Sequence, residues 1–159
     1  MNKVALADCP FVPWRNGGGR TRELLAWPSA TDWTLRVSVA EIEADGPFSP
    51  FAEIDRCFAV LDGAGVVLSL PRGEVRLHRG DPALTFPGEA APLCRLIDGP
   101  TRDLNLMVRR AAGRPAMQRA PSSSGLWRGL FSGDTLYWSD DPRDTLSQRD
   151  GWWLSMEAR

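Results

Sequence analysis

The sequence predicts an all-β protein. Short segments in which apolar and polar residues alternate recur along the chain, turns rich in Gly and Pro separate them, and no segment has the periodicity of an amphipathic helix. The chain has 159 residues, 43% of them hydrophobic, which is enough to bury a core without a metal or disulfides. We therefore expect a single β-sandwich or β-barrel domain spanning residues 1–159.

The clearest strand covers residues 33–42 (WTLRVSVAEI), in which Leu35, Val37 and Val39 alternate with more polar side chains. Residues 57–61 form a second, apolar strand, and the turn at residues 62–65 (DGAG) predicts a hairpin that pairs it with residues 66–70. We expect this hairpin to be the core of the fold. Further strands are expected over residues 22–27, 74–77, 83–86, 93–97 and 103–110.

The C-terminal part of the chain changes character twice. Residues 111–125 (AAGRPAMQRAPSSSG) offer little to bury and predict a flexible surface loop. Strand-like sequence returns at residues 126–131, 135–138 and 152–156, and this tail holds four of the seven tryptophans: Trp127, Trp138, Trp152 and Trp153. Because such side chains bury too much area to stay in water, we expect the tail to supply extra closing strands to the barrel. A separate interaction motif is the alternative.

Composition and charge exclude several classes of partner. The net charge is −1, from 19 basic and 20 acidic residues, so no overall field attracts nucleic acid or an anionic membrane. Cys9, Cys57 and Cys94 are odd in number and lack CxxC spacing, which is typical of reduced, buried thiols. The sequence has neither a signal peptide nor an apolar run that could cross a bilayer, so we expect a cytoplasmic protein.

One stretch, Pro13–Glu23 (PWRNGGGRTRE), is unlike a helix or a strand interior, because three consecutive glycines lose too much backbone freedom there. We expect it to form a pocket wall at the mouth of a barrel, with backbone N–H groups as donors. Arg20 and Thr21 follow the glycines where a phosphate-binding loop has Gly-Lys-Ser/Thr, so that motif is excluded.

A second pattern has the spacing of a metal-binding barrel without the metal ligands. In the first motif of cupin barrels, glycines flank two histidines and a glutamate. The same intervals here hold Gly46, Ala52, Ile54, Phe58 and Gly65, none of which can ligate a transition metal. His78, the only histidine, precedes a turn and is expected to be solvated or bonded to that turn. We therefore expect neither a metal or other cofactor nor a Ser-His-Asp triad.

Polar side chains also occupy one face of two expected strands. Arg36 and Ser38 share the face opposite the apolar residues of the 33–42 strand, and Asp103 and Asn105 do the same in the 103–110 strand. If both faces line the barrel mouth, they supply a guanidinium group for a carboxylate and amide and hydroxyl groups for orientation, with Arg56 nearby. The alternative is that these faces are simply solvated.

Three segments resemble the HutD/Ves family of small cupin-like proteins. They are Pro13–Glu23, Arg36–Ala40 followed by Asp45–Ser49, and Asp103–Met107, within a match from about residue 12 to residue 110. Arg15 stands where lysine is common in the family, which keeps the charge but changes its geometry. The resemblance implies a cupin-like (RmlC-type) antiparallel β-barrel or jelly roll. For members in histidine-utilisation operons it implies binding of a pathway metabolite, such as a formylated or imino derivative of glutamate.

The resemblance and the polar faces together indicate one set of ligand-binding residues and no catalytic or metal-ligating residue. The set is Trp14, Asn16, Thr21, Arg22, Glu23, Arg36, Ser38, Ser49, Arg56, Asp103 and Asn105.

Three functions follow as hypotheses. The first is a metal-independent protein that senses or buffers a carboxylate metabolite, held by Arg36 or Arg22, and modulates its pathway. The second is a metal-free cupin enzyme, an isomerase or hydrolase, with Glu23 or Asp103 as general base. The third is an interaction module in which the tryptophan-rich tail binds a partner or a second copy, as in a homodimer.

Overall fold

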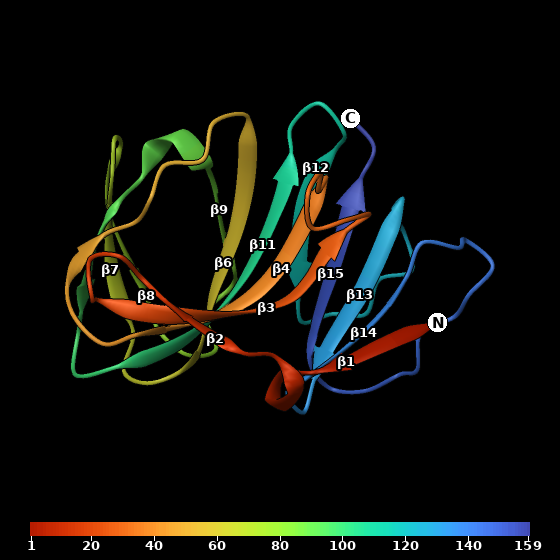
Figure 1. The fold of residues 1–159 in the computed structure, drawn as a ribbon, viewed down its shortest axis with the longest axis horizontal. Helices are drawn as coiled ribbons and strands as arrows, with labels where there is room; N and C mark the ends of the chain where they lie inside the picture. The colour runs from red at the N-terminus through yellow and green to blue at the C-terminus, as the bar shows by residue number, and fades with distance from the viewer.

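The computed structural model describes residues 1–159 and is almost entirely β-structure (Figure 1). It contains three antiparallel sheets and no α-helix, only the 3-10 turns η1 (Leu6–Asp8) and η2 (Gly88–Ala90). The all-β prediction is confirmed. No helix here has the length and apolar character needed to cross a membrane.

A six-stranded sheet lies at the centre of the molecule. Its strands, in spatial order, are β2 (Phe11–Pro13), β3 (Gly19–Trp27), β4 (Leu35–Ile42), β11 (Thr101–Arg109), β6 (Ile54–Asp62) and β9 (Leu84–Pro87). One face meets a four-stranded sheet made of β5 (Gly46–Pro47), β10 (Leu93–Leu96), β7 (Val66–Leu70) and β8 (Gly73–Leu77). These two sheets enclose the barrel, on the left of Figure 1.

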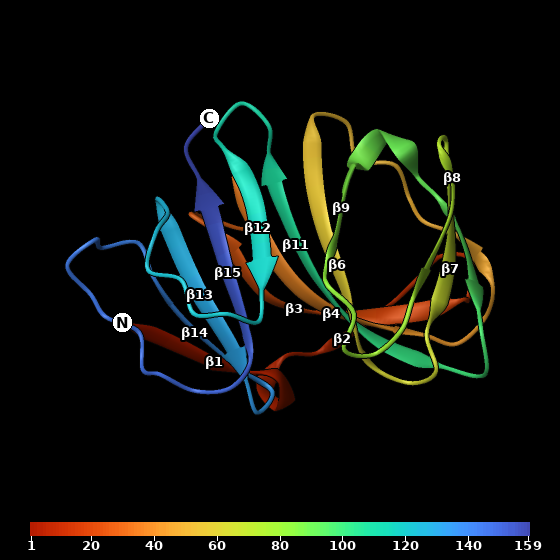
Figure 2. The same cartoon turned by 180° about the vertical axis from the view of Figure 1, so that it is seen from behind.

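A five-stranded sheet covers the other face of the central sheet, as Figure 2 shows from behind. Its strands, in order, are β1 (Asn2–Ala5), β14 (Thr135–Ser139), β13 (Trp127–Ser132), β15 (Trp152–Glu157) and β12 (Arg114–Gln118). The tail therefore packs back on the body, as expected. Its strands form a sheet of their own with β1 and β12 rather than extending the sheets of the barrel.

The central sheet serves two hydrophobic cores because side chains alternate along each strand. Leu35, Val37 and Val39 of β4 pack against Trp127 and other residues of the five-stranded sheet. Ile42, on the opposite face of β4, belongs to a second core inside the barrel. Of the four tail tryptophans, Trp127, Trp152 and Trp153 are buried and Trp138 is partly buried against the same core, so they do not form the exposed surface that the interaction-module hypothesis required.

The predicted central hairpin is wrong. The strand before the turn, β6, pairs with β11 and β9, whereas the strand after it, β7, pairs with β8 and β10 in the other sheet. Residues 62–65 therefore carry the chain from one sheet to the next. Gly63 and Gly65 have φ of 98° and 120°, and a Cβ atom at either would collide with a backbone carbonyl oxygen. Close packing at the crossover thus needs the same residues as a tight hairpin.

The prediction of a loop over residues 111–125 is wrong for residues 114–118, which form β12 and pair with β15. Pro115 and Met117 alternate with more exposed residues and are buried. The segment has few apolar residues, and the surrounding Pro, Ser, Gly and Arg residues hide their alternation in the sequence.

The remaining expectations concern single residues. The three cysteines are free thiols, with Cys57 and Cys94 buried and Cys9 partly buried. The backbone N–H of His78 donates to Asp81 Oδ2 at 2.7 Å, and its Nδ1 lies 3.3 Å from the same oxygen, as expected for a turn-bonded imidazole.

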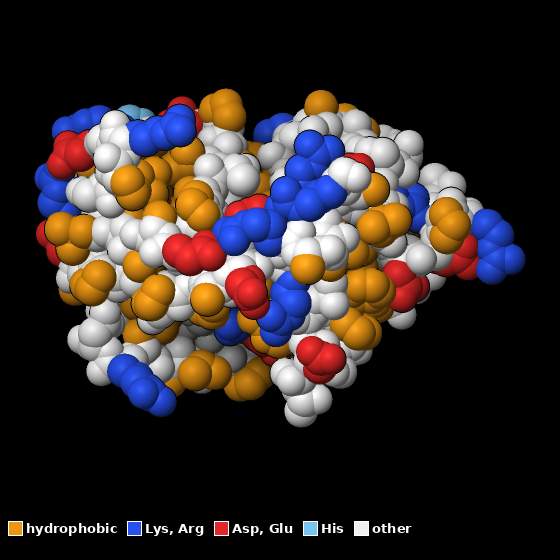
Figure 3. All heavy atoms as spheres, turned by 90° about the horizontal axis from the view of Figure 1, so that it is seen from above, with side chains coloured by type: hydrophobic (Ala, Val, Ile, Leu, Met, Phe, Trp, Pro, Cys, Tyr) orange, Lys and Arg blue, Asp and Glu red, His pale blue; other side chains and the backbone are white.

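Ion pairs join the barrel to the rest of the molecule at one end. Arg110 lies 2.9 Å from Asp55 and 2.8 Å from Glu89, and Arg159 lies 2.7 Å from Asp55. Seen from above, charged side chains gather in a band across the junction of the two halves (Figure 3).

Candidate functional site

The register of the central sheet gathers polar side chains on its barrel face. Glu23 and Asn105 flank Ser38 in one row, because Ser38 pairs with both. In a neighbouring row Met107 pairs with both Arg36 and Arg56. The two polar faces predicted from alternation therefore look into the same barrel interior.

These side chains are mostly buried rather than solvated. Relative exposure is 4% for Ser38, 5% for Arg56, 0% for Asp103 and 4% for Asn105. Buried polar groups are costly unless they are paired, so this set needs a specific explanation.

Arg56 is the most unusual member of the set. Its Nη2 donates to Asn105 Oδ1 at 2.8 Å, but its Nε has no partner, and no carboxylate forms an ion pair with it. The guanidinium carbon lies 5.1 Å from the ring centroids of Phe48 and Phe86 and 5.6 Å from that of Phe51. Burial and the charge of a nearby arginine lower the pKa of Arg56 to about 10, so it remains a cation at neutral pH.

Arg36 occupies a different environment. Its Nε lies 2.9 Å from Glu23 Oε1, and the two side chains are 26% and 41% exposed. Glu23 therefore neutralises Arg36 where the barrel interior opens to solvent. Arg56, deeper inside, has no such counter-charge.

Asp103 is a fully buried carboxyl group in the same interior. Thr101 Oγ1 donates to its Oδ2 at 2.7 Å, whereas its Oδ1 has no partner. Burial raises the pKa of Asp103 to about 7, against the opposing effect of the Thr101 hydrogen bond. Near neutral pH this group can therefore either donate or accept a proton.

The glycine stretch is explained by packing. Gly17 has φ of 75°, and its N–H donates to the carbonyl of Trp14, while the N–H of Gly18 donates to Asn16 Oδ1. A Cβ atom on Gly19 would lie 3.1 Å from the indole ring of Trp14. The expectation that these glycines offer free backbone donors to a ligand is therefore wrong for Gly17 and Gly18, whose N–H groups are already bonded.

The structure brings together most of the predicted site. The Nε1 of Trp14 donates to Thr21 Oγ1 at 2.7 Å, and Trp14 packs against the barrel core. Arg22 does not join this group, because it lies on the opposite face of the sheet, where Nη1 donates to the carbonyl of Leu6. Ser49 is exposed on the loop after β5, and the side chain of Asn16 is held within its own loop. A binding role for each residue stays a prediction.

The donor set does not fit a metal. No three His, Cys, Asp or Glu side chains converge anywhere in the chain. The groups that line the barrel interior are instead guanidinium, amide, hydroxyl and a single deeply buried carboxyl group, which suit an organic anion.

Comparison with known protein families assigns this chain to a family. The HutD family model matches residues 6–156. This chain belongs to the HutD family. The resemblance seen in the sequence is thereby confirmed.

Individual relatives agree with this assignment to the HutD family. Protein Ves of Cronobacter sakazakii is 33% identical over 152 residues, which cover 91% of this chain and 82% of Ves. An uncharacterised 21.2 kDa protein from the hutC 3′ region of Pseudomonas putida is 34% identical over 122 residues, 76% of this chain and 64% of that protein.

Solved structures confirm the fold. HutD from Pseudomonas fluorescens SBW25, in a formate condition, superposes with a TM-score of 0.86 at 24% identity, over 99% of this chain and 98% of HutD. The cupin domain of Schizosaccharomyces pombe Cnp3 gives a TM-score of 0.51 at 14% identity, over 66% of this chain and 72% of that domain. The barrel of this HutD-family protein is therefore cupin-like, as predicted.

Sequence reasoning missed several residues of the HutD-family barrel. Phe48, Phe51 and Phe86 surround Arg56, and Thr101 bonds Asp103. In the sequence, Phe48 and Phe51 carry no sign of which charged side chain they contact. Nothing in the sequence singled out the other two residues.

Proposed function

We propose that this protein binds a small carboxylate metabolite inside the barrel, without a metal. One observation carries the proposal: Arg56 is a cation with 5% exposure and no carboxylate partner. Leaving a charge buried and uncompensated is costly, and a ligand carboxylate would remove that cost.

The surroundings of Arg56 suit such a ligand. A guanidinium group can bind a carboxylate through two parallel hydrogen bonds, and its Nε here is free. The rings of Phe48, Phe51 and Phe86 exclude water around the charge, which strengthens an ion pair. Arg36, nearer the opening, is already paired with Glu23, so Arg56 is the cation that accounts for a ligand carboxylate in this interior.

The names of the relatives support a choice among carboxylate metabolites. One relative is named for the hutC region, and the family name HutD has the same prefix. We propose a histidine-degradation intermediate, such as a formylated or imino derivative of glutamate, and that its occupancy of the barrel modulates that pathway.

Isothermal titration calorimetry against a panel of these intermediates, with formate as the smallest carboxylate, tests the proposal. Arg56→Gln should weaken binding by about 10- to 100-fold, because a hydrogen bond to a charged group is worth about 1.5–3 kcal/mol. Arg72→Gln, an exposed position in the β7–β8 turn, is the matched control and should bind normally. If no compound produced heat at millimolar concentration, the proposal would fail.

A metal-free enzyme is the second candidate, and Asp103 is the observation that favours it. A general base works best with a pKa near the working pH, and Asp103 combines a pKa of about 7 with a free Oδ1. Glu23 is 41% exposed and paired with Arg36, so it is the weaker candidate. Product formation from the same panel, measured by NMR for the parent and for Asp103→Asn, decides between the two. Binding without any product supports the binding protein alone.

The expected homodimer stays a prediction. Light scattering at several protein concentrations, with and without ligand, would test it.

A further inference from the structure

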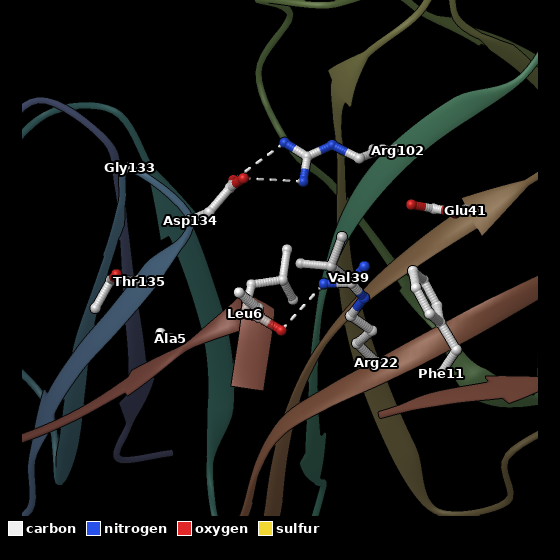
Figure 4. Close-up of a pocket in the computed structure, with 11 residues that line it drawn as sticks. Ala5, Leu6, Phe11, Arg22, Val39, Glu41, Arg102, Gly133, Asp134 and Thr135 are labelled. Carbon is white, nitrogen blue, oxygen red and sulfur yellow. Dashed lines mark hydrogen bonds and ion pairs between the residues drawn. The ribbon is translucent and has the colours of Figure 1, made fainter. Parts of the chain in front are cut away.

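A cavity lies outside the barrel. It has a volume of about 280 Å³, is partly open to solvent, and is bounded by the outer face of the central sheet, η1 and the β13–β14 turn. Figure 4 shows Leu6 and Val39 in its middle, Arg22 and Phe11 on one side, and Asp134 opposite. The six-stranded sheet separates it from the barrel interior.

The charges around this cavity are paired, with one exception. Arg102 lies 2.7 Å from Asp62 and 3.1 Å from Asp134. Glu41 lies 2.7 Å from Arg20. Arg22 alone among the charged lining residues forms no ion pair.

Arg22 is also incompletely hydrogen-bonded. Its Nη1 donates to the carbonyl oxygen of Leu6 at 3.2 Å, while its Nε is buried and has no partner. The guanidinium carbon lies 3.7 Å from the centroid of the Phe11 ring, which holds the group in place. A water molecule could satisfy the Nε–H, but it could not neutralise the charge.

We propose that this cavity binds a small monocarboxylate with a short apolar chain, at a site distinct from the barrel. The carboxylate lies on Arg22, the only charge there without a counter-charge, and the chain lies against Leu6, Phe11 and Val39. The volume is below the range of about 300–1,000 Å³ that is usual for sites of drug-sized ligands, so the ligand is small. This site does not depend on the function proposed for the barrel.

One strand supplies both sites. Arg22 and Glu23 are neighbours on β3, and alternation sends Arg22 to the outer cavity and Glu23 to the barrel opening. A carboxylate bound at either site can therefore be recognised by which backbone amides respond to it.

The test is a titration of the full-length ¹⁵N-labelled protein with butyrate, followed by amide chemical shifts. Butyramide, which has nearly the same shape and no charge, is the matched ligand. We expect saturable shifts at the amides of Leu6, Val39 and Asp134 with butyrate, and much weaker binding of butyramide. Arg22→Gln should weaken butyrate binding by about tenfold or more, because it removes a charge-assisted hydrogen bond. Arg72→Gln is the control variant and should bind butyrate as the parent does.

A second variant covers the case in which Arg22→Gln does not fold. Ala5→Leu places a larger apolar side chain at a lining position without changing any charge, and it should abolish the same shifts. The proposal is overturned if butyramide binds as well as butyrate, or if the Ala5→Leu protein still binds. It is equally overturned if butyrate perturbs only amides of the barrel interior, or none.

Discussion

Replacing Asp103 by Asn removes a carboxyl group that the barrel holds with no exposed surface. In the folded protein its pKa is about 7, whereas its ordinary value is 3.8, and burial is the main cause. The folded state therefore binds this proton more tightly than the unfolded chain does. The stability that Asp103 contributes is fully present below about pH 4 and is lost as the pH rises through about 7.

The size of the effect follows from the pKa change. A rise from 3.8 to about 7 corresponds to about 4 kcal/mol, at about 1.4 kcal/mol for each pH unit. Asn cannot ionise, so the Asp103→Asn protein lacks this dependence. Any cost of leaving the Asn side chain poorly bonded is about 1–3 kcal/mol and does not change with pH.

Urea unfolding of both proteins at intervals from pH 5 to pH 8 measures the effect as a difference. Other titrating groups cancel in this difference, so the free energy of unfolding of the parent, relative to Asp103→Asn, should fall from pH 5 to about pH 7 and then level off. Asp98→Asn, at an exposed turn, is the control and should show no such trend. A difference that is constant with pH would refute the reasoning, because it would mean that Asp103 does not titrate in this window.

Three further predictions concern packing. Gly19→Ala should lower the free energy of unfolding by about 1–3 kcal/mol, because its Cβ would lie 2.5 Å from the backbone carbonyl oxygen of Glu41 and would also press on the indole ring of Trp14, whereas Gly46→Ala has space; equal unfolding midpoints would contradict this. Met117→Ala should lower the free energy of unfolding, measured in urea, by about 2–5 kcal/mol, whereas Gln118→Ala, at an exposed position, should leave it almost unchanged. Similar small losses for both variants would mean that β12 does not pack as described. Cys9 should be the only thiol that reacts with Ellman's reagent in the folded protein, since the other two are buried with pKa values of about 11 and 12; fast labelling of three thiols would contradict this.

Strand positions were largely predictable because alternation is a local property. The strand expected at residues 33–42 is β4, Leu35–Ile42, and the strand expected at residues 103–110 is β11, Thr101–Arg109. Strand partners are not local, and the hairpin expected around residues 62–65 is a crossover between sheets. A turn sequence reports the backbone conformation that glycine permits, not the sheet in which the next strand pairs.

The candidate site shows the same limit. Arg36, Ser38, Asp103 and Asn105 were placed on common faces by alternation, and the register confirms that they meet. Alternation along β3 also places Arg22 on the opposite face from Thr21 and Glu23, but the family resemblance assigned all three to one binding site.

The sequence by itself determined the all-β class, the family and the side chains that share a face of each strand, because these depend on residue type and on a period of two along the chain. Only the tertiary structure decided which faces meet, and with them which charges are compensated. Arg36 forms an ion pair with Glu23. Arg56 and Arg22 lie on opposite faces of the same sheet, and neither forms an ion pair with a carboxylate. Burial and ion pairing depend on distances between residues far apart in the chain, so no local pattern could reveal that these two cations lack counter-charges.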